Sequence, residues 1–507
     1  MLPHVLGTPE QFTALREALV HLGYTAQAVA ERTGVPSVCN FRAIREGRTV
    51  GLDLADPLDV LIRVFMDAEM VEWAVVRRRI PPAALAAMEA LGLVQTARSS
   101  PAHCHATVLL YPTEWLYITS DLNADPDRAA PEASPLDVVY PAITMNTVRF
   151  MSYQPWTPCE NFLELCSGTG IAALAAARLA RHAWAVDITA RATHFAEFNA
   201  RLNGLTNVTA VQGDLYAPVE GIKFDRIAVH PPYVPARENK YIFRDGGEDG
   251  EQITRAAIAG LANHLAPGGR FYCTCLATDR KGMPLEGRVR EMLGERRDEF
   301  DVLLITMQEF PPLEYYARAA AQGRGTFAEV GEWHKLFTRL QIERLVYGTI
   351  VVQRHTSTRP AYTGRRQVCP VISPAEADWL LSWEVAALDP DMSRRLLDFR
   401  PRAASRANLN LVLRQRDAVW TPEECSVAVH SPFVLAVECP VWVAALLAAC
   451  DGATTVREHL AFFRGNGALP PGAPDQDFLG IVKALISGGI LEIPEFPLPP
   501  AAPVAGQ

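Results

Sequence analysis

The chain has 507 residues, of which 49% are hydrophobic and 21% charged, and its formal net charge is −9. This length exceeds what one hydrophobic core usually supports, so we expect several domains. An acidic chain lacks the general attraction to phosphate that nucleic-acid-binding proteins use. The sequence contains no run of about 18 apolar residues, so no membrane-spanning helix is predicted. The start of the chain resembles no signal peptide, and the ten cysteines form no CxxC pair. We therefore expect a cytoplasmic protein without a metal site.

Residues 1–105 are predicted to form a helical domain. Apolar residues recur with helical spacing at 12–20, 25–33, 58–75 and 82–91. The pattern resembles a winged-helix bundle. Such bundles bind DNA in regulators but also serve as dimerisation or substrate-lid modules, and the absence of a basic recognition helix favours the second use. We expect a homodimer.

Residues 106–145 are predicted to form a strand-containing connector. Two strands are expected at 106–110 and 115–119, and the polar, proline-rich stretch 124–135 indicates a linker or exposed loop. From about 160 to 300, strand patterns alternate with helix patterns. This alternation predicts an α/β domain with a parallel sheet, which we place at residues 146–355.

A glycine-rich turn opens this domain. The short buried strand 162–166 runs into Ser167-Gly168-Thr169-Gly170, and an alanine-rich helix is predicted from Ile171 to about His182. Glycines at a strand-to-helix turn let the backbone approach a ligand closely, because a Cβ would collide with it. Nucleotide-binding folds share such a turn, so the turn alone does not identify the ligand.

The next elements narrow the ligand. A predicted strand at 183–187 ends in Asp187, which is placed to accept hydrogen bonds from both hydroxyls of a ribose. After a helix at 190–203 and a strand at 208–212, Gly213-Asp214-Leu215 places an acid where it would pair with an adenine amine. A fourth strand, 224–229, ends in His230-Pro231-Pro232-Tyr233, a tetrapeptide that nicotinamide-binding domains have no reason to carry.

Residues 160–275 therefore resemble class I S-adenosylmethionine (SAM) methyltransferases, and among them the HemK-type protein-glutamine N-methyltransferases, which share Cys166 in place of the first loop glycine. The resemblance implies a Rossmann-like, seven-stranded fold that binds SAM, closed by an antiparallel strand pair at 301–307 and 345–354. It also implies that Glu164 faces the methionine amino group. The predicted cofactor-binding residues are Glu164, Ser167, Gly168, Gly170, Asp187, Ile188, Asp214, Leu215 and His230.

The tetrapeptide at 230–233 resembles the family's (Asn/Asp)-Pro-Pro-(Tyr/Phe) motif, which implies methylation of a nitrogen. In that motif the first side chain and the next proline carbonyl accept hydrogen bonds from the target N–H groups, while the aromatic ring covers the acceptor. Here His230 replaces Asn. It either accepts a hydrogen bond, removes a proton, or merely fills space.

An acidic, glycine-rich loop follows at 241–251, before a helix predicted at 251–265. Its acids either hold a cationic acceptor such as a guanidinium or cap the helix. We predict that His230, Tyr233 and Glu248 are catalytic and that Pro231, Tyr233, Asp245, Glu248 and Asp249 bind the substrate. The insertion at 311–344 is either a lid or packing.

Residues 356–495 are predicted to form an α+β domain, and 496–507 a disordered tail. Strands are expected at 409–414, 426–429, 434–438 and 490–493, and helices at 440–450, 455–463 and 477–487. The segment 439–493 resembles a winged-helix or PqqD-like module. PqqD-like modules bind leader peptides, but such a fold more often packs or dimerises.

These features favour a SAM-dependent N-methyltransferase acting on a small amino-acid-like or cationic substrate, such as the guanidino group of arginine, in a biosynthetic pathway. The first alternative is a peptide or protein methyltransferase of the glutamine type. An RNA-base methyltransferase comes next, and a SAM-sensing DNA-binding regulator last.

Overall fold

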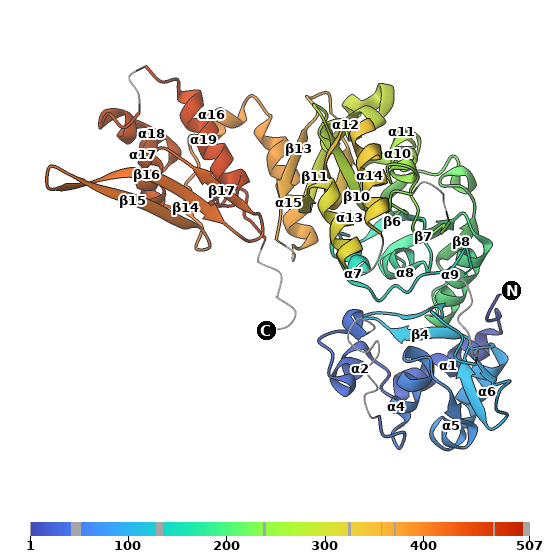
Figure 1. Ribbon diagram of the computed structural model, residues 1–507. Coiled ribbons are helices and arrows are strands. Elements are labelled where there is room, and N and C mark those ends of the chain that lie inside the picture. The colour runs from blue at the N-terminus through green and yellow to red at the C-terminus, as the bar shows by residue number, and fades with distance from the viewer. Residues whose placement is uncertain are drawn as a thin grey trace. The chain divides into compact units, whose positions relative to one another are not determined.

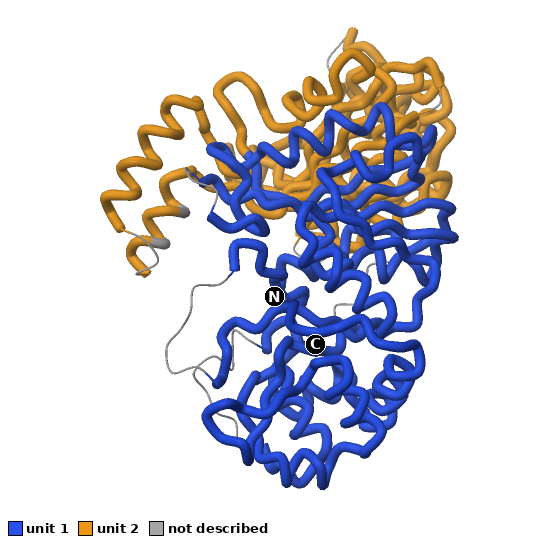
Figure 2. The backbone as a smooth tube through the Cα atoms, turned by 90° about the vertical axis from the view of Figure 1, so that its right-hand side faces the viewer, with its two compact units in different colours: residues 1–277 blue, residues 278–507 orange. Residues whose placement is uncertain are grey.

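The computed structural model describes residues 2–41, 52–127, 135–236, 240–322, 326–355, 357–369, 372–469 and 472–499. The chain divides into two compact units, residues 1–277 and 278–507 (Figure 2). Most of the predicted linker at 124–135 and of the predicted tail at 496–507 lies outside the described residues. The domain boundaries expected from the sequence stay predictions. In the described part of the chain, no helix combines the length and the hydropathy that a membrane span requires.

The first unit begins with helices and two small antiparallel sheets (Figure 1). One sheet has the strand order β1–β3–β2, and the other is the hairpin β4–β5. The elements are α1 (Pro9–His21), α2 (Ala26–Thr33), η1 (Val38–Asn40), α4 (Pro57–Leu61), η2 (Ile62–Met66), β1 (Val71–Glu72), α5 (Trp73–Arg79), α6 (Pro82–Ala90), β2 (Val94–Thr96), β3 (His103–Ala106), β4 (Val108–Pro112) and β5 (Tyr117–Asp121).

The single helix predicted at 58–75 is wrong. Helix α4 passes into the π-helical turn η2, and Ala68 then adopts a left-handed backbone conformation with a φ of 55°. A π turn is widened by one residue per hydrogen bond, and a left-handed residue ends a helix. The chain therefore leaves the helical path, forms β1 and starts again as α5.

The centre of the first unit is a parallel sheet with the strand order β10–β9–β6–β7–β8. Its elements are α7 (Met145–Ser152), β6 (Cys159–Leu165), α8 (Ile171–Ala176), β7 (Ala180–Asp187), α9 (Ala190–Leu202), β8 (Val208–Gln212), η3 (Ala217–Val219), β9 (Phe224–Val229), α10 (Gln252–Ala259), α11 (Leu261–His264) and β10 (Leu265–Arg280). The Rossmann-like α/β fold expected from the sequence is confirmed.

Two helices predicted in this region differ from the structure. Helix α8 ends at Ala176 instead of His182, because Asn207 donates side-chain hydrogen bonds to the carbonyls of Ala177 and Ala180 and so holds the chain in a turn. The helix predicted at 251–265 is interrupted at Gly260. A Cβ on Gly260 would lie 2.3 Å from the ring of Tyr216, so only glycine allows this close packing.

Helix α9 joins the N-terminal elements to the central sheet. Its buried Phe195 and Phe198 share a hydrophobic core with Phe12 of α1. The fully buried Asn199 donates hydrogen bonds to the carbonyls of Thr119 and Thr169 and accepts two from Thr119. Because all its polar atoms are paired, Asn199 ties strand β5 to the glycine-rich turn.

The second unit begins with α12 (Leu285–Met292), η4 (Gly294–Glu299), β11 (Phe300–Phe310), α13 (Pro312–Ala321), α14 (Phe327–Arg339), β12 (Ile342–Arg354) and β13 (Thr363–Gln367). Strands β11 and β12 are antiparallel, which confirms the predicted pair. Strand β13, which the sequence did not predict, pairs in parallel with β11. The predicted insertion at 311–344 is the helix pair α13–α14.

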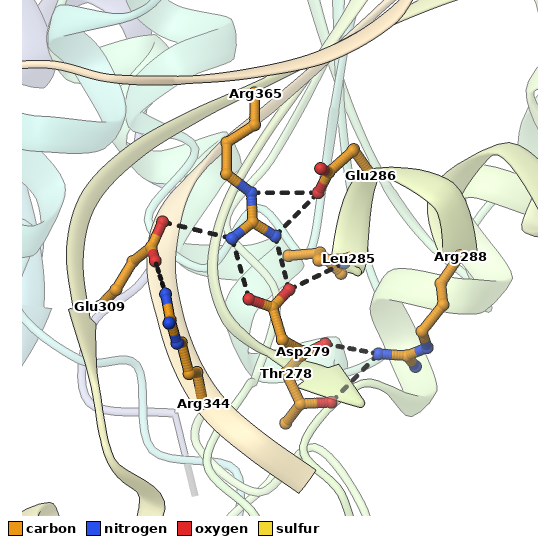
Figure 3. Close-up of polar contacts among 8 residues, drawn as sticks. All are labelled: Thr278, Asp279, Leu285, Glu286, Arg288, Glu309, Arg344 and Arg365. Atoms are coloured by element: carbon orange, nitrogen blue, oxygen red, sulfur yellow. Dashed lines mark hydrogen bonds and ion pairs between the residues drawn. The ribbon is translucent and has the colours of Figure 1, made fainter. Parts of the chain in front are cut away.

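Strand β13 is held by an ion-pair network (Figure 3). The guanidinium of Arg365 binds the carboxylates of Asp279, Glu286 and Glu309. Asp279 also accepts a hydrogen bond from the backbone N–H of Leu285 at the start of α12. One arginine thereby fastens β13 to β11 and α12.

The rest of the second unit is a mixed α and β region, as expected for 356–495. It comprises α15 (Pro374–Ala387), α16 (Met392–Leu396), β14 (Arg402–Ala403), β15 (Asn408–Arg416), β16 (Val419–Val429), β17 (Leu435–Glu438), α17 (Val441–Ala449), α18 (Val456–Gly465), α19 (Asp475–Ser487) and β18 (Leu491–Glu492). Strands β15, β16 and β17 form an antiparallel sheet whose β15–β16 hairpin projects from the helices (Figure 1).

Candidate functional site

A cavity of about 600 Å³ lies in the first unit at the carboxyl ends of β6, β7 and β9. In parallel α/β sheets this edge is where ligands bind. The predicted site residues that line the cavity are Glu164, Ser167, Gly168, Asp187, Ile188, Asp214, Leu215, His230, Pro231, Tyr233 and Asp245. Gly170, Glu248 and Asp249 do not line it.

Gly168 and Gly170, the two glycines of the turn that were predicted to bind the cofactor, have different surroundings. Gly168 has a φ of 52° and lines the cavity. A Cβ built there would meet no atom within 4 Å, so no other part of the protein covers the backbone on that side. Gly170 has a φ of 79°, and its Cβ would lie 3.0 Å from the Cβ of Ala196 on α9. Gly168 leaves room for a ligand, whereas Gly170 permits helix packing.

Two residues without glycine's freedom adopt left-handed backbone conformations in the cavity wall. Cys166 has a φ of 55° and Leu215 a φ of 46°. Cys166 follows β6, which contains Glu164, and Leu215 follows Asp214 in the loop after β8. Such strained residues gather at functional sites, where the surrounding structure holds them.

Glu164 lies at the inner end of the cavity. Its carboxylate is buried and accepts a 2.8 Å hydrogen bond from the backbone N–H of Ala173 in α8. Burial raises the pKa of Glu164 to about 8 despite that hydrogen bond. A cation placed beside this carboxyl would favour its ionised form.

Asp187 ends β7 and shapes the glycine-rich turn. One oxygen accepts a 3.0 Å hydrogen bond from the backbone N–H of Gly168, and the other accepts from the backbone and hydroxyl of Thr189. Burial raises the pKa of Asp187 above its ordinary value. Asp214 and Ile188 also line the cavity, and the side chain of Ile188 is exposed.

Two buried polar atoms in the cavity wall have no hydrogen-bond partner among the described residues. One is the hydroxyl of Ser167 in the turn, and the other is Nε2 of His230. Buried polar groups are almost always paired, so an unpaired one in a cavity wall indicates a ligand with matching polar atoms. The bare Gly168 backbone, the Ser167 hydroxyl and the acids together fit a nucleoside-containing cofactor such as SAM.

His230 is held as a neutral ring. It stacks on Phe150, with ring centroids 5.2 Å apart and ring planes 15° apart, and it also contacts the ring of Tyr233. Burial lowers the pKa of His230 to about 4. The imidazole is therefore uncharged near neutral pH and has one nitrogen available to accept a hydrogen bond.

Helix α7 contributes residues that the sequence analysis missed. Asn146 lines the cavity and donates a 3.1 Å hydrogen bond from Nδ2 to the hydroxyl of Tyr233. Phe150 of the same helix supports His230. The sequence does carry a signal for this helix, because Thr144 caps it by accepting a hydrogen bond from the backbone of Thr147.

The glycine-rich loop at 241–251 supports the tetrapeptide. The backbone N–H of Val234 donates to the carbonyl of Arg244, and the backbone N–H of Gly246 donates to the carbonyl of Val234. A Cβ on Gly246 would lie 2.6 Å from the carbonyl oxygen of Pro232. A Cβ on Gly250 would lie 2.4 Å from the carbonyl oxygen of Tyr233. These glycines therefore allow the loop to lie directly against the tetrapeptide backbone.

The acids of this loop bind the protein's own groups. Asp245 accepts hydrogen bonds from the backbone of Lys240 and Tyr241 and from the side chain of Arg244. Asp249 pairs with Arg255 of α10, as does Glu251, while Glu248 is exposed outside the cavity wall. In this structure the loop acids brace the loop and the start of α10. The catalytic role of Glu248 stays a prediction.

Residues 150–294 match the family model of the methyltransferase small domain. This segment contains β6 to β10 and the cavity wall from the glycine-rich turn to the tetrapeptide. This segment is therefore similar to methyltransferase domains, a family whose methyl donor is SAM.

Three curated relatives illustrate the similarity. The chain is 37% identical over 128 residues to the release factor glutamine methyltransferase of Moorella thermoacetica (22% of this chain, 45% of the relative). It is 32% identical over 178 residues to the ribosomal protein uL3 glutamine methyltransferase of Bradyrhizobium diazoefficiens (32% and 52%). It is 38% identical over 117 residues to a putative protein N5-glutamine methyltransferase of Methanocaldococcus jannaschii (22% and 58%). The chain thus spans about half the length of these relatives.

Proposed function

We propose that the protein transfers the methyl group of SAM to the side-chain amide nitrogen of a glutamine within a polypeptide. The observation that carries the proposal is the neutral His230, whose Nε2 lies unpaired in the cavity wall. An amide N–H matches such an acceptor. The names of the three relatives, all glutamine methyltransferases, support the same acceptor. The proposal replaces the small cationic substrate favoured by the sequence.

In this proposal the inner end of the cavity holds SAM. Asp187 accepts hydrogen bonds from the ribose hydroxyls, and Glu164 faces the amino group of the methionine part. Ile188 covers one face of the adenine, and Asp214 accepts from its amine. When bound, SAM supplies an electrophilic methyl group on a sulfonium.

The acceptor end aims the amide nitrogen. Nε2 of His230 and the carbonyl of Pro231 each accept one N–H of the glutamine amide, which directs the nitrogen lone pair toward the methyl carbon. The side chains of Asn146 and Tyr233, which are joined by a hydrogen bond, border the same space. Most of the acceleration comes from this positioning, because an amide nitrogen is a weak nucleophile.

The N–C bond forms while the C–S bond breaks, and the electron pair of that bond stays on sulfur. The nitrogen then loses one proton, which Nε2 of His230 receives through the hydrogen bond that it already makes. Its low pKa lets His230 pass the proton on to solvent.

An arginine guanidinium is disfavoured as the acceptor because Asp245 and Asp249 of the loop already bind groups of the protein. Asp245 is bound by Lys240, Tyr241 and Arg244, and Asp249 is bound by Arg255. A guanidinium would have to displace these partners to gain a bidentate pair. The predicted homodimer and the predicted roles of the terminal domains stay predictions.

The test uses the full chain with isotopically labelled SAM and three acceptors: a peptide with one internal glutamine, free glutamine and free arginine. Mass spectrometry should show one methyl group on the glutamine side-chain nitrogen of the peptide. The Asp187→Asn variant, incubated in parallel, controls for transfer that does not use the cavity. Methylation of arginine without methylation of the peptide would refute the proposal.

A further inference from the structure

Four large apolar side chains are exposed beside the acceptor end of the cavity. Leu136 is 64% exposed, Tyr140 46%, Ile242 45% and Phe243 37%. We call these four residues the apolar rim. Tyr140, Ile242 and Phe243 also line the cavity, whereas Leu136 does not. The rim therefore begins inside the cavity and continues beyond it.

The rim is built from two segments that hold each other in place. The backbone N–H of Ile242 donates a 3.1 Å hydrogen bond to the carbonyl of Leu136. The rings of Tyr140 and Phe243 are stacked, with centroids 5.2 Å apart and planes 8° apart. Stacked rings tied by a backbone hydrogen bond form a surface that needs little ordering when a partner binds.

Arg244, next to Phe243 of the rim, is already paired with a carboxylate. The guanidinium of Arg244 binds the carboxylate of Asp245 and lies over the ring of Tyr241, 5.0 Å from its centroid. An acidic partner therefore finds no free cation at this arginine. The rim favours contact with apolar side chains, because adjoining exposed apolar residues bordered by polar ones mark interaction surfaces.

The continuity with the cavity indicates the occupant. A free amino acid held in the cavity would leave Leu136 uncovered, because that side chain lies outside the wall. A polypeptide that inserts one glutamine must run across the mouth, so that residues next to the glutamine cover the rim. We propose that the apolar rim binds the residues flanking the acceptor glutamine and selects large aliphatic or aromatic side chains there.

This inference rests on the proposed glutamine methylation and adds a sequence preference to it. Burying one leucine or phenylalanine side chain favours binding, and the expected preference is at least about tenfold in kcat/KM. Neutral association through apolar contact predicts that the preference persists at high salt.

The test compares two amidated ten-residue peptides with one central glutamine. One carries leucine and phenylalanine within two positions of the glutamine, and the other carries serine at those positions. The wild-type chain should methylate the apolar peptide with about tenfold higher kcat/KM. In Phe243→Ser and Leu136→Ser this ratio should fall toward one. Val20→Ser, which removes a side chain that is 63% exposed on α1, is the matched control and should keep the ratio.

The possible failures are distinguishable when SAM affinity is measured on the same samples. Tight SAM binding without methylation of either peptide overturns the proposed function and the rim together. Methylation of both peptides with equal kcat/KM overturns the rim alone. Leu136 is so exposed that its replacement cannot break a core, so an unchanged ratio in Leu136→Ser also counts against the rim. A concentration-dependent dimer that Phe243→Ser abolishes would assign the rim to a second copy of the chain.

Discussion

The imidazole of His230 lies flat against the phenyl ring of Phe150, with 5.2 Å between the ring centroids. The contact explains how a histidine replaces the asparagine expected in this motif. A stacked, buried ring keeps a low pKa and a fixed direction for Nε2. Phe150 reaches the site from helix α7, which precedes the first strand of the central sheet.

The first prediction concerns the pH dependence of methyl transfer. Protonated His230 has no acceptor nitrogen, so kcat should fall as the pH drops through about 4, with no transition near 6.5. His230→Ala should lower kcat by about 100-fold or more. His230→Asn should recover part of that loss, because its carbonyl accepts a hydrogen bond, and should lack the acidic transition.

The pH dependence of kcat has to be separated from the pH dependence of the fold's stability. His230 has a lower pKa when folded than the 6.5 of an unfolded histidine, so the unfolded chain binds more protons between about pH 4 and 6.5. This group therefore makes the fold less stable as the pH falls through that window. Circular dichroism at each pH separates unfolding from loss of activity. Equal kcat in His230→Ala and the wild type would exclude the histidine from the acceptor site.

The second prediction concerns Asp187. Asp187→Asn should weaken SAM binding by about 100-fold, because hydrogen bonds from both ribose hydroxyls to a carboxylate contribute about 1.5–3 kcal/mol each. Isothermal titration calorimetry with SAM measures this loss. Asp225→Asn is the matched control, since Asp225 also accepts backbone hydrogen bonds, from Glu160 and Asn161, but lies outside the cavity wall. Similar SAM affinities in the two variants would show that Asp187 does not hold the cofactor.

The third prediction concerns proton release on SAM binding. The pKa of Glu164 is about 8 in the free protein, and the SAM ammonium should lower it. Binding below pH 8 must then expel a proton, so SAM affinity should rise with pH, by up to about tenfold per unit, and level off above 8. Calorimetry in buffers of different ionisation enthalpy counts the protons released.

Glu164→Gln is the control for this linkage, because the amino group of SAM itself titrates in the same range. The variant should bind SAM with a flatter pH dependence and release fewer protons. The stability of the Glu164→Gln variant should also lack the pH dependence that Glu164 contributes. Folded Glu164 stays protonated between about pH 4.5 and 8 while the unfolded residue does not, so its contribution to stability falls as the pH rises through that window. An identical proton count in both proteins would contradict the assignment.

Local patterns were enough to predict the sheet and to pick out residues that line one cavity at its edge. The strands at 208–212 and 224–229 have the predicted bounds, because apolar runs bounded by turn residues are local signals. The alanine-rich helix α8 is shorter than its composition suggests, since Asn207, from a distant loop, ends it. Helix propensity cannot reveal such a tertiary contact.

The acceptor end was less predictable for the same reason. Asn146, which donates a hydrogen bond to the hydroxyl of Tyr233, lies 87 positions earlier in the chain. The acids of the loop form a pattern equally compatible with holding a substrate and with bracing the loop. Only the positions of Arg244 and Arg255 show which partners they have.

The fourth prediction concerns the network of Figure 3. Arg365→Met removes the cation shared by Asp279, Glu286 and Glu309 and leaves Asp279 and Glu286 without it, while Glu309 keeps Arg344, so it should lower the free energy of unfolding by about 3 kcal/mol. Urea denaturation measures the change. Arg394→Met is the control, because Arg394 makes an exposed pair with Asp391 that is worth well under about 1 kcal/mol. Equal losses in the two variants would mean that the network does not stabilise β13.

The last prediction separates the two glycines of the cofactor turn. Both have positive φ, so alanine at either position costs about 1 kcal/mol of backbone strain. At Gly170 the new Cβ also meets Ala196, and Gly170→Ala should therefore unfold at markedly lower denaturant concentration.

At Gly168 the new Cβ meets no protein atom, yet it would stand beside the cavity where the cofactor backbone contact forms. Gly168→Ala should therefore keep most of its stability and lose SAM affinity by at least about tenfold, whereas the folded fraction of Gly170→Ala should still bind SAM. Denaturation and calorimetry on the same preparations give both quantities. If SAM affinity falls only in step with stability in both variants, the turn acts through packing, and the backbone at Gly168 does not contact the cofactor.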